Sequence, residues 1–274
     1  MKLSKRMSRL GTETAFEVLA KARALEAQGR EIIHLEIGEP DFHTPLNVVE
    51  AGVTALRGGH THYTPAAGIL PLRQTIADEV ARTRGISVHP DQVVVVPGGK
   101  PIMFFILLAM CEAGDEVIYP NPGFPIYESM ISFTGATPVP IPLRMENEFG
   151  LDVDELAGLV TDRTRLIILN SPANPTGGVA TAQQLAQVAE IARARGIPLL
   201  SDEIYCRILY DDAFASIASI PGMAEQTIIL DGFSKTYAMT GWRLGYGVMP
   251  VELARQITKL MVNSNSCTSS FTQR

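Results

Sequence analysis

The chain has 274 residues, of which 46% are hydrophobic and 19% are charged, and its formal net charge is -6. This composition supplies a core large enough for one large domain or two smaller ones. The acidic balance disfavours both nucleic acid and an anionic membrane surface as partners, so we expect small-molecule substrates.

The cysteines and the apolar runs indicate the cellular compartment. Cys111, Cys206 and Cys267 are far apart and form no CxxC motif. Their spacing argues against a disulfide framework or a zinc site and favours a reducing compartment. The longest apolar run, residues 102–111, has about half the length of a membrane-spanning helix. We therefore expect a cytoplasmic protein with no metal site, targeting segment or membrane anchor.

The first third of the chain shows helical periodicity. Apolar residues at Phe16, Leu19 and Leu25 predict an amphipathic helix that ends near Gly29. A second helix is expected over residues 71–84, because a glycine follows directly.

After residue 92 the pattern changes to short β-branched runs separated by helix-like segments. One such segment, residues 181–196, begins with a capping box of Thr181 and Gln184 and ends at Gly196. Uninterrupted apolar runs are typical of strands buried on both faces, so we predict an α/β fold with a mostly parallel sheet flanked by helices. The Pro-rich stretch 120–142 is interpreted as loops within one domain. The expected strands are residues 92–96, 116–119, 165–169, 197–202 and 227–231.

Polar or glycine-rich segments follow four of the predicted strands. Residues 98–100 follow the first strand and residues 170–178 follow the third, while Asp202 ends the fourth and residues 234–235 follow the fifth. Ligands of such sheets bind beyond the carboxyl ends of the strands. These segments therefore predict one binding site.

Each of these segments also has a plainer interpretation. Residues 98–99 are both glycine and could form a simple strand-to-helix turn, or could leave backbone N–H groups free for a phosphate. Asn174 precedes Pro175, which suits either an ordinary turn or an amide directed at a ligand. Asp202 could be a helix cap or a salt-bridge partner. Lys235 could be a solvated loop residue, but desolvation would lower its pKa and make it a useful nucleophile.

The ordered motifs GGKPIMFF, NPGFPIY, NSPANPTGG, SDEIY and SKTYAMTGWRLGY resemble those of the class I/II pyridoxal 5'-phosphate (PLP) dependent aminotransferases, in the aspartate aminotransferase superfamily of fold type I. The resemblance extends to EIGEPDF and HYTPAAGILPLR and covers essentially the whole chain. It implies PLP as cofactor and a ping-pong transfer of an amino group between an L-amino acid and a 2-oxo acid. A PLP-dependent β-lyase or synthase of the same fold and an inactive truncated PLP-binding fragment remain alternatives.

The resemblance also implies roles around the cofactor ring. Lys235 would hold PLP as a Schiff base and move the substrate proton, and Asp202 would pair with the pyridine nitrogen. Tyr205 and Asn174 would hydrogen-bond the phenolic oxygen. Phe124 would lie against the ring.

Other implied contacts concern the substrate, the partner subunit and the phosphate. Gly38 would lie near the substrate carboxylate, together with Asn174. Tyr63 would reach the phosphate in the neighbouring subunit, which implies a homodimer. Gly232 stands where the family commonly has serine, which puts one hydroxyl contact to the phosphate in question. The phosphate would be held by Gly99, Lys100, Ser234 and Arg243.

The family resemblance also predicts the domain organisation. Residues 1–44 would form an N-terminal segment, comprising an arm and part of a small domain, and residues 45–274 would form the large PLP-binding domain. Members of the family continue into a C-terminal small domain that supplies an arginine for the substrate carboxylate. We expect that domain to be missing here, so that these 274 residues alone would be poorly soluble and without turnover.

Overall fold

A seven-stranded sheet lies at the centre of the computed structural model, which describes residues 1–211 and 213–274. Its strand order is β1-β7-β6-β5-β4-β2-β3, and β7 alone runs antiparallel to its neighbours. Each expected strand is present, which confirms the predicted α/β class. The strands are β1 (Val93–Val96), β2 (Glu116–Asn121), β3 (Thr137–Pro142), β4 (Thr164–Asn170), β5 (Leu199–Asp202), β6 (Thr227–Gly232) and β7 (Gly245–Val248).

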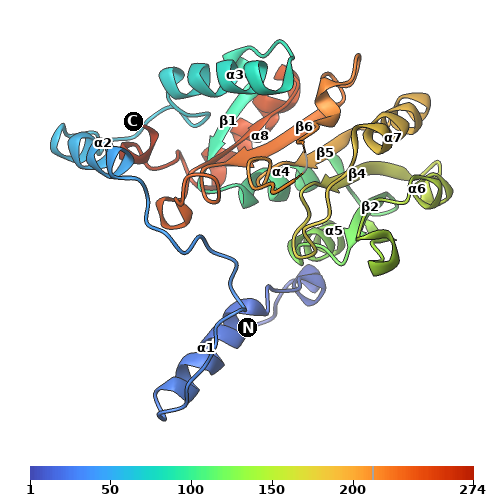
Figure 1. The fold of residues 1–274 in the computed structure, drawn as a ribbon. Helices are drawn as coiled ribbons and strands as arrows, with labels where there is room; N and C mark the ends of the chain where they lie inside the picture. The colour runs from blue at the N-terminus through green and yellow to red at the C-terminus, as the bar shows by residue number, and fades with distance from the viewer. Residues whose placement is uncertain (212) are drawn as a thin grey trace.

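Helices cover both faces of the sheet (Figure 1). Both predicted early helices are present as α1 and α3, and the capping box of Thr181 and Gln184 begins α7 as expected. Figure 1 shows α1 extending away from the sheet, joined to α2 by an extended segment. The helices are α1 (Ala15–Glu26), α2 (Leu46–Arg57), α3 (Leu70–Arg84), α4 (Lys100–Met110), α5 (Ile126–Thr134), α6 (Val153–Leu159), α7 (Ala182–Arg195) and α8 (Val251–Ser264).

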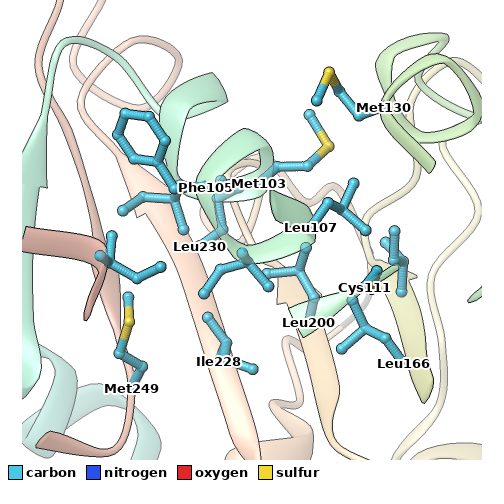
Figure 2. Packing of buried hydrophobic residues seen from close by; sticks show 14 of the residues in the cluster. Met103, Phe105, Leu107, Cys111, Met130, Leu166, Leu200, Ile228, Leu230 and Met249 are labelled. Atoms are coloured by element: carbon cyan, nitrogen blue, oxygen red, sulfur yellow. The ribbon is translucent and has the colours of Figure 1, made fainter. Parts of the chain in front are cut away.

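Alternating strand residues pack against different helices. Val94 and Val96 belong to the core beneath α4, α5 and α8, whereas Val93 and Val95 pack with α3. Figure 2 shows the first of these cores, in which α4 residues such as Leu107 lie over strand residues of β5 and β6. Successive side chains of a strand point to opposite faces of the sheet. The same alternation decides whether a side chain at the end of a strand faces the helices on one side of the sheet or those on the other.

The interpretation of residues 120–142 as loops is wrong. This stretch contains the end of β2, the whole of α5 and the whole of β3. Its prolines concealed these elements because proline is rare inside central strands. β3 is an edge strand, and its prolines are Pro138, Pro140 and Pro142.

The two edges of the sheet are closed by different means. Thr137 and Leu143 donate their N–H groups toward β2. Backbone N–H groups alternate in direction along a strand, so the N–H groups of the even-numbered positions between them would face away from β2. The prolines of β3 occupy these outward positions. At the other edge, the backbone N–H of Val95 donates to the carbonyl of Ala67 at 3.0 Å. The carbonyl of Val95 accepts the hydroxyl hydrogen of Thr268 at 3.1 Å. Loop residues therefore cover β1, whereas proline blocks β3.

Candidate active site

The buried carboxylate of Asp202 lies at the end of β5. Tyr127, on α5, donates its hydroxyl to Asp202 Oδ2 at 2.7 Å, and the backbone N–H of Ile204 donates to Oδ1 at 3.3 Å. Burial is the main cause that raises the pKa of Asp202, to about 6. Among the residues that the structure describes, no cation pairs with this carboxylate. Asp202 is therefore a buried acid that still lacks a positively charged partner.

The loop after β4 is fixed to the same strand end. Asn170 lies opposite Asp202 in the parallel register and donates its amide to the Asp202 carbonyl at 3.1 Å. Its side-chain oxygen accepts the backbone N–H of Asn174 at 2.8 Å. Asn174 is half-buried, and these bonds bring it beside the end of β5, as the sequence predicts.

Lys235 follows β6 and lies close to Tyr205. Its Nζ is 5.9 Å from the Tyr205 ring centroid and donates a hydrogen bond to the carbonyl of Gly38. Burial lowers the pKa of Lys235, while the nearby carboxylates of Glu39 and Glu13 oppose this shift. The pKa of Tyr205 is raised to about 12, mainly by burial. The site thus holds an amine that is easier to deprotonate than an exposed lysine and a phenol that remains protonated at neutral pH.

A cradle of backbone groups lies at the start of α4. Gly98 has φ +79°, and a side-chain carbon there would collide with the guanidinium of Arg243. Arg243 donates to the carbonyls of Thr240 at 2.7 Å and Pro97 at 3.3 Å. The N–H groups of Gly99 and Lys100 lie in the first turn, where a helix has no internal acceptors for them. Together with arginine, such groups form an anion-binding site.

An aromatic side chain lies next to this cradle. The ring of Phe124 packs edge-to-face on Tyr127, with 5.8 Å between centroids. Lys100 Nζ lies 5.1 Å from the Phe124 centroid and forms a salt bridge with Glu13 of the N-terminal segment. The N-terminal segment therefore reaches the same region as α4.

Tyr63 and Gly232, which the family resemblance relates to the cofactor phosphate, differ in exposure. Tyr63 is 88% exposed, unlike the buried or half-buried groups around Asp202. Gly232 is buried at the end of β6, and a side-chain carbon there would lie 3.0 Å from the Gly245 Cα. A serine at position 232 would therefore require the backbone of β7 to give by a few tenths of an ångström. Ser234 is half-buried directly before Lys235.

Sequence reasoning missed several polar residues near these strand ends. Tyr127 stands in the motif NPGFPIY but was not singled out, although it is the hydroxyl donor to Asp202. Asp231 ends the predicted strand 227–231 and lies one residue before the end of β6, so the rule that pointed to Asp202 could also have identified it. Nothing in the sequence distinguishes Arg84 from an exposed arginine at a helix C-terminus. Arg84 in fact forms buried salt bridges with Glu203 and Asp231.

Comparison with known proteins identifies the class. Residues 30–274 match the family model described as aminotransferase class I and II. A probable aspartate/prephenate aminotransferase of Aquifex aeolicus is 40% identical over 273 residues, which cover 99% of this chain and 69% of that protein. The arginine–pyruvate transaminase AruH of Pseudomonas aeruginosa is 39% identical over 246 residues, covering 90% of this chain and 63% of that protein.

Solved structures agree with the sequence comparison. The structure of aspartate aminotransferase from Thermus thermophilus with maleate has a TM-score of 0.96 and 36% identity, covering 100% of this chain and 71% of that one. The chain belongs to the class I and II aminotransferases. It is a PLP-dependent enzyme whose substrates are amino acids and 2-oxo acids, which confirms the prediction from the motifs.

The residues of the site fit this cofactor. The buried carboxylate of Asp202 lacks a cation, and a protonated pyridine nitrogen would supply one. The cradle at Gly98 lies beside the Arg243 guanidinium, where a phosphate dianion would find both charge and N–H donors. Lys235 has an amine whose pKa is lowered by burial and which could bind the cofactor.

Within residues 1–211 and 213–274, no group of three or more His, Cys, Asp or Glu side chains is arranged to hold a metal ion. None of the helices in these residues combines the length and the apolar character of a membrane span. The cysteines are free, and burial raises the pKa of Cys111 and Cys206 to about 12. These two thiols are therefore protonated at neutral pH and poorly reactive.

Proposed function

We propose that Lys235, Asp202 and Tyr205 form the catalytic centre of this aminotransferase. The observation that carries the proposal is the buried, hydrogen-bonded carboxylate of Asp202 without a cationic partner among the described residues. A buried carboxylate is costly unless it is paired. The proton on a pyridine nitrogen would supply the missing positive charge.

Each side chain around the PLP ring would have a separate role. PLP, when bound, supplies an electron sink for the substrate α-carbon. Lys235 Nζ would hold the cofactor and, once released, would move a proton between the substrate α-carbon and the C4' atom of the cofactor. Asp202 would keep the ring nitrogen protonated. Tyr205 and Asn174 would donate hydrogen bonds to the phenolic oxygen.

The remaining side chains hold and orient the ligands. Phe124 would lie against the ring, where its contact area restricts tilting. Gly38 would admit the substrate carboxylate beside Asn174, and the L-amino acid and the 2-oxo acid would use this site in turn, in a ping-pong cycle. The phosphate would be held by Gly99, Lys100, Ser234 and Arg243.

We further propose that the enzyme is a homodimer in which Tyr63 reaches the phosphate bound by the partner. The exposure of Tyr63 supports this role, since its hydroxyl is free to contact another molecule. Exposed apolar side chains near it in the sequence favour a covered interface. They are Ile33, Leu35, Phe42, Leu46 and Leu70. Size-exclusion chromatography with light scattering tests the dimer, and a monomer that binds PLP normally would contradict it.

The proposed domain organisation and location follow from the same features. We propose that residues 1–44 form an arm and part of a small domain, and that residues 45–274 form the large domain. The extended segment before α2 supports this division. The free thiols support a cytoplasmic location, because reduced cysteines are typical of that compartment. Cell fractionation would test the location.

Trapping of the cofactor tests the central proposal. The protein is mixed with PLP, its visible absorbance is recorded, and borohydride reduction is followed by peptide mass mapping. We expect a coloured species and a reduced adduct on Lys235 that Lys235→Ala abolishes. Lys21→Ala, a change on the exposed side of α1, is the matched control. An adduct that maps to other lysines and survives Lys235→Ala would refute the assignment.

A further inference from the structure

A closed cluster of charged side chains lies directly behind the site. Arg84 ends α3, and its side chain is only 2% exposed. Its Nε donates to Glu203 Oε2 at 3.0 Å, and its Nη2 donates to Asp231 Oδ2 at 2.9 Å. Nη1 donates to the hydroxyl of Thr83 at 2.6 Å. One guanidinium thus joins the end of α3 to two strands of the sheet.

The remaining acceptors of both carboxylates are also occupied. Glu203 Oε1 accepts the hydroxyl hydrogens of Ser201 at 3.0 Å and Ser216 at 2.6 Å. Asp231 Oδ2 also accepts from the Tyr246 hydroxyl at 3.0 Å, and Oδ1 accepts its neighbour's backbone N–H at 2.7 Å. A buried polar network that is fully satisfied holds its members in one arrangement.

This cluster is linked through the chain to both central groups of the site. Glu203 follows Asp202, and Asp231 lies four residues before Lys235. Asp202 bonds to α5 on one side of the sheet, while Glu203 bonds to α3 on the other. The strand ends that carry Asp202 and lead to Lys235 are therefore clamped from the opposite face by Arg84.

The cluster also affects the electrostatics of Asp202. Burial lowers the pKa of Arg84, but the charges of Glu203 and Asp231 raise it by more, so its pKa lies above the ordinary arginine value and the guanidinium stays charged. Burial raises the pKa of both Glu203 and Asp231, and the Arg84 guanidinium opposes both shifts by favouring the ionised forms. With both carboxylates ionised, one positive and two negative charges leave a net negative charge behind Asp202. Burial is the main cause of the raised pKa of Asp202, and Asp231 and Glu203 add to it. Loss of Arg84 would expose Asp202 to both carboxylates without compensation.

We propose that Arg84 is a positioning residue for the cofactor: through Glu203 and Asp231 it holds the strand ends that carry Asp202 and Lys235, and it balances the negative charge behind Asp202. This inference rests on the proposed cofactor site and adds to it a group on the far face of the sheet. Arg84 touches neither cofactor nor substrate.

The test compares two opposite changes in charge. Arg84→Gln removes the positive charge, whereas Asp231→Asn removes one negative charge and leaves the pair of Arg84 with Glu203. Arg82→Gln is the matched control, because Arg82 lies on the same helix with its side chain 67% exposed. For each protein we would measure the PLP dissociation constant by fluorescence, the pH midpoint of the visible absorbance of bound PLP, and urea unfolding.

We expect Arg84→Gln to weaken PLP binding by about tenfold, the lower end of the loss measured when a residue that orients a metal ligand is removed. The absorbance midpoint should move in opposite directions in Arg84→Gln and Asp231→Asn and stay unchanged in Arg82→Gln. A purely structural role would lower stability in both variants without this reversal.

The outcomes separate this inference from the proposed site. A wild-type protein that does not bind PLP would refute the site itself. If the wild type binds PLP and folded Arg84→Gln has the same dissociation constant and midpoint, the role of Arg84 is refuted. If Arg84→Gln does not fold, Asp231→Asn decides: a shifted midpoint supports the role, and wild-type values overturn it.

Discussion

Replacing Asp202 with asparagine should make the PLP-free protein gain stability relative to the wild type as the pH rises, while weakening its affinity for PLP. Burial raises the pKa of Asp202 from 3.8 to about 6, so the folded state binds this proton more tightly than the unfolded state. The stability linked to the proton is present below pH 3.8 and is lost as the pH rises through about 6. The shift of about 2 units corresponds to about 3 kcal/mol at pH 7, since one unit is about 1.4 kcal/mol.

Asparagine keeps the shape of the side chain and removes the ionisation. Its oxygen can accept the N–H of Ile204, and its amide can donate to the hydroxyl of Tyr127, which is also able to accept. The hydroxyl hydrogen of Tyr127 then loses its acceptor, which lowers stability by an amount that does not vary with pH. The change of the stability difference with pH should therefore reflect the charge, whereas its constant part also contains the lost hydrogen bond.

Urea unfolding of both PLP-free proteins between pH 4 and pH 8 measures this difference. We expect Asp202→Asn to gain stability relative to the wild type as the pH rises, by about 3 kcal/mol in total, and to level off near pH 7. Asp78→Asn, an exposed change on α3, is the matched control. A difference that does not vary with pH would refute the reasoning, and so would a variant that binds PLP as tightly as the wild type.

Three further predictions concern neighbouring parts of the site. Tyr127→Phe should raise the pKa of Asp202 above about 6, because the lost hydroxyl hydrogen bond lowers it; NMR titration of the carboxyl carbon would reveal an unchanged value if this is wrong. Attachment of PLP to Lys235, followed by absorbance, should have a pH midpoint below the ordinary lysine value of 10.5, because burial lowers the pKa of the amine. Gly98→Ala and Gly29→Ala should each cost about 1 to 2 kcal/mol in unfolding free energy, since both glycines have positive φ. Only Gly98→Ala should weaken PLP binding, because no atom lies within 4 Å of a side-chain carbon at Gly29; equal affinities would contradict this.

The sequence predicted elements whose local pattern agrees with their surroundings. β4 and β6 are continuous β-branched or leucine-rich runs buried on both faces, so pattern and burial coincide. β7 was missed because its residues, GYGV, contain two glycines and have no clear strand pattern. β3 was missed because its prolines are compatible only with an edge position, which depends on the strand order.

The residues of the site also divide into those that a local pattern predicts and those that depend on the fold. Asp202 and Lys235 could be proposed because they follow buried strands within recognisable motifs. Arg84 could not, since its partners lie 119 and 147 residues away along the chain. Only the packing of α3 against the sheet decides whether this arginine is a buried cation or a solvated one.

The treatment of the sheet edges bears on how the protein behaves when crowded. An open edge strand is a template for strands from other molecules, which is a common route to aggregation. Along β3, the outward positions at Pro138, Pro140 and Pro142 have no N–H to offer, and along β1 the groups of Val95 are already bonded to Ala67 and Thr268. Neither edge can readily extend its ladder with an incoming chain. Replacing these prolines with threonine would create the donors needed for such pairing and should promote fibrous or amorphous association.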